Sequence, residues 1–217
     1  SRGGALKQIT HKKSLKEQIE KGGLLVWPIL AIGFLAALIG IERIFFLRRV
    51  HLNTDKVMGK VNELAALGAW EECHNMVGKK KIPVYNVLRA GLNARTENRD
   101  TLESILQESI LKEMPKLERH LPLLNIMGTI APLLGLLGTV TGMITTFHVI
   151  TLYGTKDPRM MSGGISTALI TTMLGLAVAI PVMLLYTFLY RKVEHVIADM
   201  EEKAVALTNI IFREAGT

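Results

Sequence analysis

Three long stretches without a charged side chain constrain the fold of this chain more than any other feature. Residues 24–41, 121–155 and 160–190 contain no Asp, Glu, Lys or Arg, although these four types make up 21% of the 217 residues. A helix needs about 20 mostly apolar residues to cross the hydrocarbon core of a bilayer. The sequence therefore predicts an all-α membrane protein with three transmembrane helices, and the charged segments lie outside the membrane.

The charge pattern divides the chain into seven segments. We expect the second and third transmembrane helices to be long and to extend into a cytoplasmic helical domain. The predicted segments are an amphipathic N-terminal segment (1–23), three spans (24–49, 121–150 and 164–190), a helical insert (50–120), a periplasmic turn (151–163) and a C-terminal helix (191–217).

The insert has the apolar periodicity of several short helices. Apolar residues recur at helical spacing from Val57 to Leu67, and Gly68 then permits a turn. A second helix is expected from Trp70, a third from Pro83, and a fourth from about Arg99 that runs into the second span. Pro115 and Pro122 interrupt this last pattern and predict kinks rather than a break.

Basic residues predict the orientation in the membrane. Residues 48–120 and 191–217 together carry 17 Lys and Arg, against 8 in 1–23 and 151–163. The positive-inside rule therefore places the insert and the C-terminus in the cytoplasm and the N-terminus in the periplasm. The net charge of +7 fits a membrane lipid surface better than nucleic acid, because no basic run is interleaved with aromatic residues.

Small residues in the second and third spans predict close helix packing. Gly138 and Gly142 form one pair of small residues four positions apart, and Gly164 and Ala168 form another. Such faces let helix backbones approach closely inside a membrane. Two such helices should pack tightly with each other or with copies of themselves. Because a three-helix protomer has little interior in which to bury these faces, we expect a homo-oligomer.

Three threonines are candidates for an ion pathway. Thr139, Thr171 and Thr172 lie at similar depth in adjacent antiparallel spans, so their hydroxyl oxygens could surround a small cation or hold a chain of water. The alternative is that each hydroxyl bonds a carbonyl of its own helix. We expect that second behaviour for five other threonines: Thr129, Thr141, Thr145 and Thr146 in the second span, and Thr187 in the third.

Chemical catalysis has no sequence support. We find no nucleophile, cofactor or metal motif, so an enzyme is not expected, and Cys73 beside His74 is interpreted as an incidental surface pair. No Asp, Glu or Lys lies in the middle of a span, although a proton-coupled machine needs a group that binds the ion within the membrane. If the chain conducts ions, a partner must therefore supply the carboxylate.

Three sequence motifs stand out: WPIL at 27–30 with Glu42-Arg43, APLLGLLGTVTGM at 131–143, and GISTALITTMLGL at 164–176 followed by AIP at 179–181. Together they resemble the proton-channel family of ExbB, TolQ and MotA. Three predicted spans are typical of ExbB and TolQ, whereas MotA types have four, and the chain is most similar to ExbB-type subunits of TonB energising systems.

The resemblance implies a bacterial inner-membrane homopentamer around a dimer of a single-span partner of the ExbD or TolR type. That partner supplies a membrane aspartate, and ion flow moves it inside the pentamer, which energises a TonB-like protein and outer-membrane transport. Thr139 and Thr172 match the two threonines that line the lumen in the family. No cofactor is implied beyond the coupling ion, H⁺ or Na⁺.

Two positions depart from the family pattern. Thr167 stands where many relatives carry a glutamate, so that acid cannot take part here. Thr171 stands where proton-driven relatives often have alanine, and the Thr171-Thr172 pair resembles sodium-driven stators similar to MotA. A transient Na⁺ site at Thr139, Thr171 and Thr172 thus stays open, as do a TolQ-like role in envelope maintenance and a passive scaffold.

Overall fold

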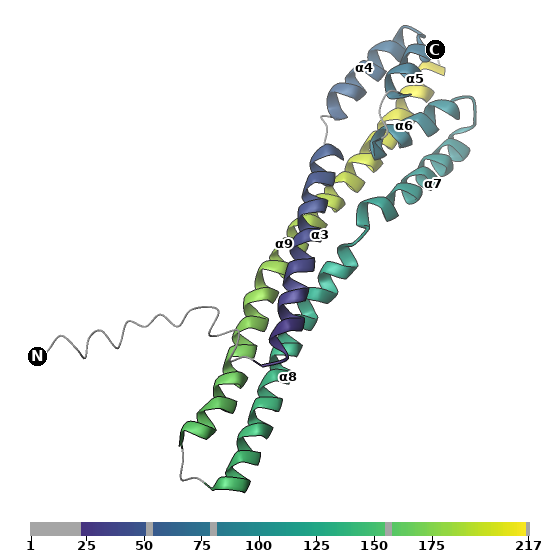
Figure 1. The fold of residues 1–217 in the computed structure, drawn as a ribbon. Helices are drawn as coiled ribbons and strands as arrows, with labels where there is room; N and C mark the ends of the chain where they lie inside the picture. The colour runs from purple at the N-terminus through teal and green to yellow at the C-terminus, as the bar shows by residue number, and fades with distance from the viewer. Residues whose placement is uncertain (1–22, 51–53, 79–81, 155–157, 216–217) are drawn as a thin grey trace, which may run out of the picture. The chain divides into compact units, whose positions relative to one another are not determined.

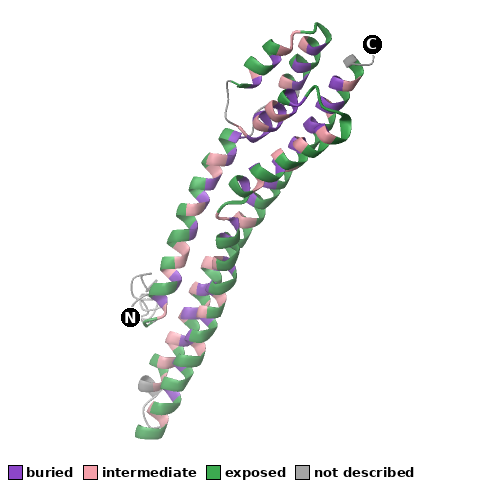
Figure 2. Ribbon diagram, turned by 90° about the vertical axis from the view of Figure 1, so that its right-hand side faces the viewer, coloured by how far each residue is buried: buried purple, intermediate pink, exposed green. Residues whose placement is uncertain are grey.

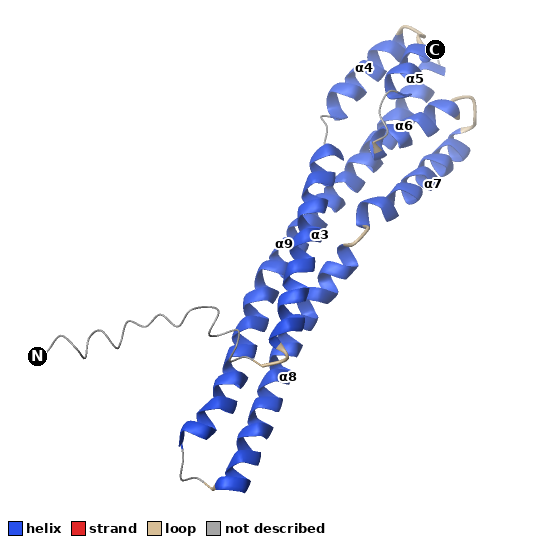
Figure 3. Ribbon diagram, viewed as in Figure 1, coloured by secondary structure: helices blue, strands red, loops and turns tan. Residues whose placement is uncertain are grey.

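The computed structural model describes residues 23–50, 54–78, 82–154 and 158–215, and all regular structure in these ranges is helical (Figure 3). The amphipathic segment predicted over 1–23 falls, apart from Gly23, outside the described residues. The helices are α3 (Val26–Val50), α4 (Thr54–Ala66), α5 (Trp70–Gly78), α6 (Pro83–Asn93), α7 (Arg99–Glu118), α8 (Leu121–Tyr153) and α9 (Pro158–Ala215), as labelled in Figure 1.

Three helical stretches are long and apolar enough to cross a membrane. They are Val26–Val50, Arg99–Tyr153, which joins α7 and α8, and Met161–Arg213. Large apolar side chains cover their outer sides, and Figure 2 shows much of these helices exposed. Phe34 and Leu184, for example, are 66% and 68% exposed. Lipid can solvate a surface that would drive aggregation in water. The predicted class, an all-α protein with three membrane-spanning helices, is confirmed.

The chain divides into two compact units. The first comprises residues 1–40 and 123–186, and thus the start of α3, most of α8 and the first half of α9. In this unit α3 packs on α9, since a methyl group added at Gly33 would lie 3.2 Å from the Val178 side chain. The second unit comprises residues 41–122 and 187–217.

The second unit contains the predicted helical insert. Within it α4 packs on α5, α5 on α6, and α6 on α7. Gly68 has φ +71°, which ends α4 as expected, and Pro83 begins α6, where its missing N–H costs no hydrogen bond. Asn98 caps α7 by accepting a hydrogen bond from the Thr101 N–H at 2.8 Å. These boundaries agree with the helices predicted from spacing.

The path from α7 to α8 is broken, so the prediction of a kinked but continuous helix is wrong here. α7 ends at Glu118, Arg119 has ψ 133°, and His120 has φ 67°, in the left-handed region. α8 then begins at Leu121 with Pro122 in its first turn. Proline is tolerated in a first turn, but in a continuous helix Pro122 could not bond the Glu118 carbonyl and its ring would clash with it, so a new start replaces a kink.

The turn predicted over 151–163 is also shorter than expected. α8 continues to Tyr153 and ends at Gly154, which has φ +73° and donates its N–H to the Ile150 carbonyl at 2.8 Å. α9 already begins at Pro158, because proline is pre-organised for the first helical position. Gly163 and Gly164 therefore lie inside α9.

Cys73 is buried, so its interpretation as part of a surface pair is wrong. The residue is 0% exposed on α5, and its Sγ lies 3.8 Å from the Val61 carbonyl oxygen. His74 is exposed and bonds Asn93 at 2.9 Å. Neighbouring positions on a helix point about 100° apart, so one of the two faces the core of the unit and the other faces outward.

Burial raises the pKa of the Cys73 thiol, and the carboxylate of Glu72 adds to this effect, against a weaker opposing hydrogen bond from its own backbone. We therefore expect iodoacetamide at pH 8 to alkylate Cys73 much more slowly in the folded protein than in urea. As pH rises above the ordinary thiol pKa of about 8.5, the Cys73 thiol loses its proton in the unfolded chain before it does so in the folded chain. The free energy of unfolding should therefore fall as pH rises. Mass spectrometry of the alkylated protein measures the rate, and equal rates in both states would contradict the burial.

Candidate functional site

Small residues of α8 and α9 form one continuous contact inside the first unit, which we call the small-residue seam. The seam positions are three or four residues apart on both helices, the spacing at which left-handed helix pairs pack. They are Gly128, Ala131, Gly135, Gly138, Gly142 and Thr146 on α8, and Gly164, Ala168, Thr171 and Gly175 on α9.

The two backbones approach so closely that side chains would not fit at several seam positions. A Cβ atom added at Gly142 would lie 2.7 Å from the Gly164 carbonyl oxygen and 2.9 Å from the Ala168 nitrogen. One added at Gly175 would lie 2.7 Å from the Ala131 carbonyl oxygen. Because these obstacles are backbone atoms, they cannot rotate away. Glycine is therefore required for the observed distance between the helices.

The four predicted packing residues all lie on this contact within a single chain. Gly138 faces Thr171, while Gly142 faces Gly164 and Ala168. Of the two arrangements expected for these faces, the structure shows the packing of the two helices on each other, since α9 of the same chain covers α8. The homo-oligomer itself stays a prediction that these four residues do not support.

Thr171 fills the seam rather than facing a lumen within the protomer. It is 0% exposed and packs against the bare backbone of Gly138. Its hydroxyl donates to carbonyl oxygens of its own helix, at 3.0 Å to Thr167 and 2.9 Å to Ala168. This is the local bonding that threonine can make in any membrane helix.

Thr172 and Thr139 are both half-buried and differ in how their hydroxyls bond. The Thr172 hydroxyl crosses from α9 to α8 and donates to the Gly135 carbonyl at 3.1 Å. The Thr139 hydroxyl donates to the Leu136 carbonyl of its own helix at 2.6 Å. Of the three candidate threonines, only Thr172 therefore links the two helices.

Four other threonines of α8 behave as predicted. Each donates to a carbonyl of its own helix at 2.9 to 3.1 Å: Thr129, Thr141, Thr145 and Thr146. The seam thus offers hydroxyl and carbonyl oxygens but no carboxylate, because residues 121–155 and 160–190 contain no Asp or Glu. Its oxygens can bind water or a cation weakly, whereas a strong proton-binding group must come from elsewhere.

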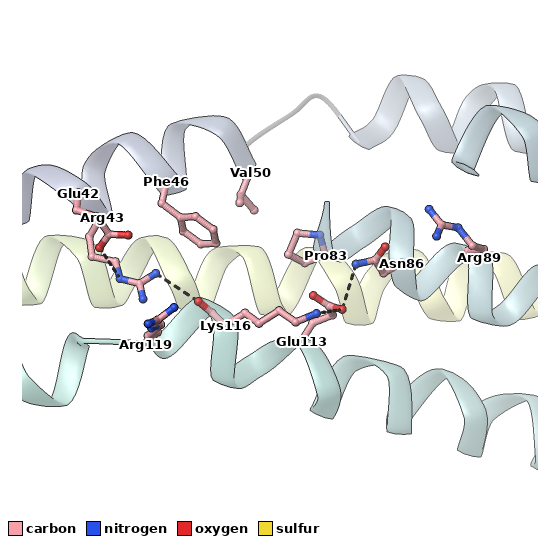
Figure 4. A pocket seen from close by; sticks show the side chains of 10 residues that line it. All are labelled: Glu42, Arg43, Phe46, Val50, Pro83, Asn86, Arg89, Glu113, Lys116 and Arg119. Atoms are coloured by element: carbon pink, nitrogen blue, oxygen red, sulfur yellow. Dashed lines mark hydrogen bonds and ion pairs between the residues drawn. The ribbon is translucent and has the colours of Figure 1, made fainter. Parts of the chain in front are cut away.

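A second polar cluster lies in the second unit, and Figure 4 shows its side chains. Arg43 Nε lies 3.4 Å from a carboxylate oxygen of Glu42, and Arg43 Nη1 donates to the Lys116 carbonyl at 3.3 Å. Glu113 Oε1 accepts from Asn86 Nδ2 at 3.1 Å and from Lys116 Nζ at 2.8 Å. Arg43 is 1% exposed and Glu113 is 6% exposed, so both charges are buried.

One feature of the α7 sequence could have predicted this cluster, although the apolar spans did not indicate it. Glu113 occupies a core-facing position of α7, in line with four buried apolar residues: Leu102, Leu106, Ile110 and Leu117. A carboxylate at such a position requires a partner, because an isolated buried charge is costly.

Comparison with known proteins agrees with this architecture. A biopolymer transport ExbB homologue of Methanothermobacter thermautotrophicus is 34% identical over 186 residues, which is 85% of this chain and 66% of that protein. ExbB of Aquifex aeolicus is 41% identical over 86 residues, 40% of this chain and 58% of that protein. TolQ of Haemophilus influenzae is 34% identical over 104 residues, 48% of this chain and 46% of that protein.

The chain thus spans about two thirds or less of the length of these three relatives. The sequence model of the MotA/TolQ/ExbB proton channel family matches residues 79–202, which include α8 and most of α9. This match contains the whole small-residue seam and both half-buried threonines. The chain therefore belongs to the MotA/TolQ/ExbB proton channel family.

Proposed function

We propose that this chain is the ion-conducting subunit of an inner-membrane complex of the ExbB–ExbD type. The complex uses the ion gradient to energise TonB-dependent transport across the outer membrane. The observation that carries the proposal is the seam between α8 and α9, with the Thr172 hydroxyl bonded across it to Gly135 at 3.1 Å. The two relatives named ExbB support the ExbB-type role.

The hydroxyls of Thr139 and Thr172 can accept a hydrogen bond from the group that carries the proton. A hydroxyl has one donor and two acceptor lone pairs, and both donors are engaged by backbone carbonyls. Each oxygen can therefore still accept a hydrogen bond from water or from a protonated acid. Since these spans have no carboxylate, an aspartate on a dimer of single-span partners, enclosed by five copies of this chain, completes the pathway.

The proposed topology follows from charge. The insert and the end of α9 lie in the cytoplasm, and the N-terminus lies in the periplasm, because basic residues accumulate on the side of the insert. The gradient is then dissipated by ions that pass from the periplasmic to the cytoplasmic side along α8 and α9.

The proton is the coupling ion in this proposal. Sodium needs several oxygen ligands at close range, and Thr171 is fully buried with its hydroxyl bonded to its own helix. We expect Thr171→Val to keep at least half of wild-type transport, and we expect transport to persist when sodium is replaced by potassium at constant pH and membrane potential. Transport that needs sodium and is lost in a correctly folded Thr171→Val variant would indicate a sodium ligand at Thr171.

A TolQ-like role in envelope maintenance is the second candidate, favoured by the match to the TolQ protein of Haemophilus influenzae. The test expresses this chain and its single-span partner in bacteria that lack their own ExbB–ExbD and TolQ–TolR pairs. Restored growth on a ferric siderophore supports the ExbB-type role, and restored detergent resistance supports the TolQ-type role. An assembled complex that restores neither would indicate a passive scaffold.

A further inference from the structure

Arg43 is a buried cation whose hydrogen-bonding capacity is only partly used. Its Nη1 donates to the Lys116 carbonyl, and its guanidinium lies 5.1 Å from the centre of the Phe46 ring. Nη2 is buried and has no hydrogen-bond partner among the described residues. An unpaired buried donor on a charged group is costly, so an arrangement of this kind indicates a ligand that accepts hydrogen bonds.

This donor lines a pocket of about 580 Å³ whose lining residues all belong to the second unit. Ligand pockets commonly measure about 300–1,000 Å³. The charged lining residues are four cations and two carboxylates: Arg43, Arg89, Lys116 and Arg119, with Glu42 and Glu113. Figure 4 shows Arg119 beside Arg43, so two like charges lie close together at one end of the pocket. A bound anion would relieve their repulsion.

The N-terminus of α6 adds to the positive potential. Pro83 begins this helix of 11 residues and lines the pocket, and Ile82 before it supplies no side-chain cap. Helix N-termini carry a partial positive charge and free N–H groups, and they commonly bind phosphate. This feature is independent of the Arg43 guanidinium and favours the same kind of ligand.

The pocket also presents one unpaired acceptor. Glu113 uses Oε1 for Asn86 and Lys116, whereas Oε2 is buried without a hydrogen-bond partner among the residues described. A simple anion would leave this oxygen unsatisfied. The complementary ligand therefore carries a negative group for the arginines and a hydrogen-bond donor for the carboxylate.

We propose that this pocket binds a phosphate ester that also carries a hydrogen-bond donor. Arg43 and Arg119 hold the phosphate oxygens, and Glu113 Oε2 accepts from an ammonium or hydroxyl group of the ligand. Arginine suits this task because its planar fork matches phosphate geometry. The ligand is either a phospholipid headgroup or a soluble phosphate ester.

The position of the pocket along the chain makes both sources accessible. Glu42 and Arg43 directly follow the uncharged run 24–41, and Arg119 lies just before the uncharged run 121–155. These residues thus mark the ends of two membrane spans, where headgroups and soluble esters are both present.

Native mass spectrometry of the detergent-solubilised full chain tests the proposal with three short-chain lipids. Phosphatidylethanolamine and phosphatidylglycerol carry donors, whereas phosphatidylcholine has the phosphate but no donor. We expect the first two to bind at least about ten-fold more tightly than phosphatidylcholine, because only they satisfy Glu113. Equal affinity for all three lipids would overturn the assignment of Glu113.

Two variants test the phosphate contacts. Arg43→Lys keeps the positive charge but loses the planar guanidinium that can donate two parallel hydrogen bonds to a phosphate. We expect this variant to bind the lipid at least about ten-fold more weakly than the wild type. Arg119→Gln changes an exposed residue, so it tests the site even if the Arg43 variant misfolds. We expect this variant to bind the lipid about three-fold or more weakly than the wild type. The control Arg49→Gln changes an exposed arginine of α3 outside the pocket and should bind normally. Identical binding in Arg119→Gln and Arg49→Gln would overturn the proposal.

Soluble phosphoethanolamine distinguishes the two sources. If the ligand is a lipid, the soluble ester should bind far more weakly than the intact lipid, because it lacks the acyl chains. If the ester binds as tightly as the lipid, and loses its affinity in Arg119→Gln, the occupant is a soluble phosphate ester. Absence of binding by both ligands would contradict a phosphate site.

Discussion

Replacing Gly142 with alanine is expected to destabilise the protein by about 1–3 kcal/mol, the usual cost of overpacking a close contact. The added methyl group would lie 2.7 Å from the Gly164 carbonyl oxygen, and backbone atoms on α9 cannot rotate away from it. For a chain of this size the melting temperature should fall by about 2–4 °C per kcal/mol. Thermal unfolding of the purified protein in detergent, followed by circular dichroism, measures the change.

Gly163→Ala is a matched control, since Gly163 is exposed and lies one residue from Gly164 in α9. Nothing among the described residues lies within 4 Å of a Cβ atom added there, its own helical turn aside. Alanine also has a higher helix propensity than glycine, so this variant should melt at the wild-type temperature or slightly higher. A similar fall in both variants would show that the effect does not come from the seam.

The double variant Thr139→Val and Thr172→Val is expected to lose at least ten-fold in partner-dependent transport while the protein still folds. Valine keeps the shape of threonine and removes both hydroxyls from the proposed pathway. The folded protein loses the bond from Thr172 to the Gly135 carbonyl, a cost of only about 0.5–1.5 kcal/mol. Transport per assembled complex separates the loss of function from this small loss of stability.

Two further variants control for side-chain shape. Thr145→Val removes an exposed hydroxyl that bonds the Thr141 carbonyl of its own helix, and it should transport normally. Thr172→Ser in the otherwise wild-type chain keeps the hydroxyl and removes only the methyl group. This variant should keep much of the wild-type transport. Full transport in the double valine variant would favour the passive scaffold over the ion pathway.

Local spacing predicted the helices well because each signal lies within a few residues of the structure it determines. The apolar period set α4 to α6, and Gly68 ended α4 because its left-handed φ suits glycine. Pro122 indicates an interruption, but no local signal indicates that His120 takes a left-handed φ, which is uncommon for a residue other than glycine. The sequence around Pro122 therefore predicted a kink instead.

The spacing of residues in the sequence could not predict which helices and side chains contact one another in the folded chain. The spacing of Gly138 and Gly142 identified a close-packing face but not which helix would cover it, and α9 of the same chain does so. Thr171 and Thr172 are adjacent in sequence, yet one fills the seam and the other bonds across it, because a helix turns by about 100° per residue. The burial of Cys73 and Glu113 likewise depends on neighbours far away in the sequence.

Proton flux into liposomes tests the central claim, that α8 and α9 form an ion pathway completed by a partner acid, most directly. Liposomes would contain this chain with its single-span partner, and an acid pulse outside would drive protons toward a trapped pH-sensitive dye. We expect flux only when both proteins are present, and at least ten-fold less flux with Thr139→Val and Thr172→Val. Equal flux from this chain alone, or undiminished flux in the double variant, would contradict the proposed pathway.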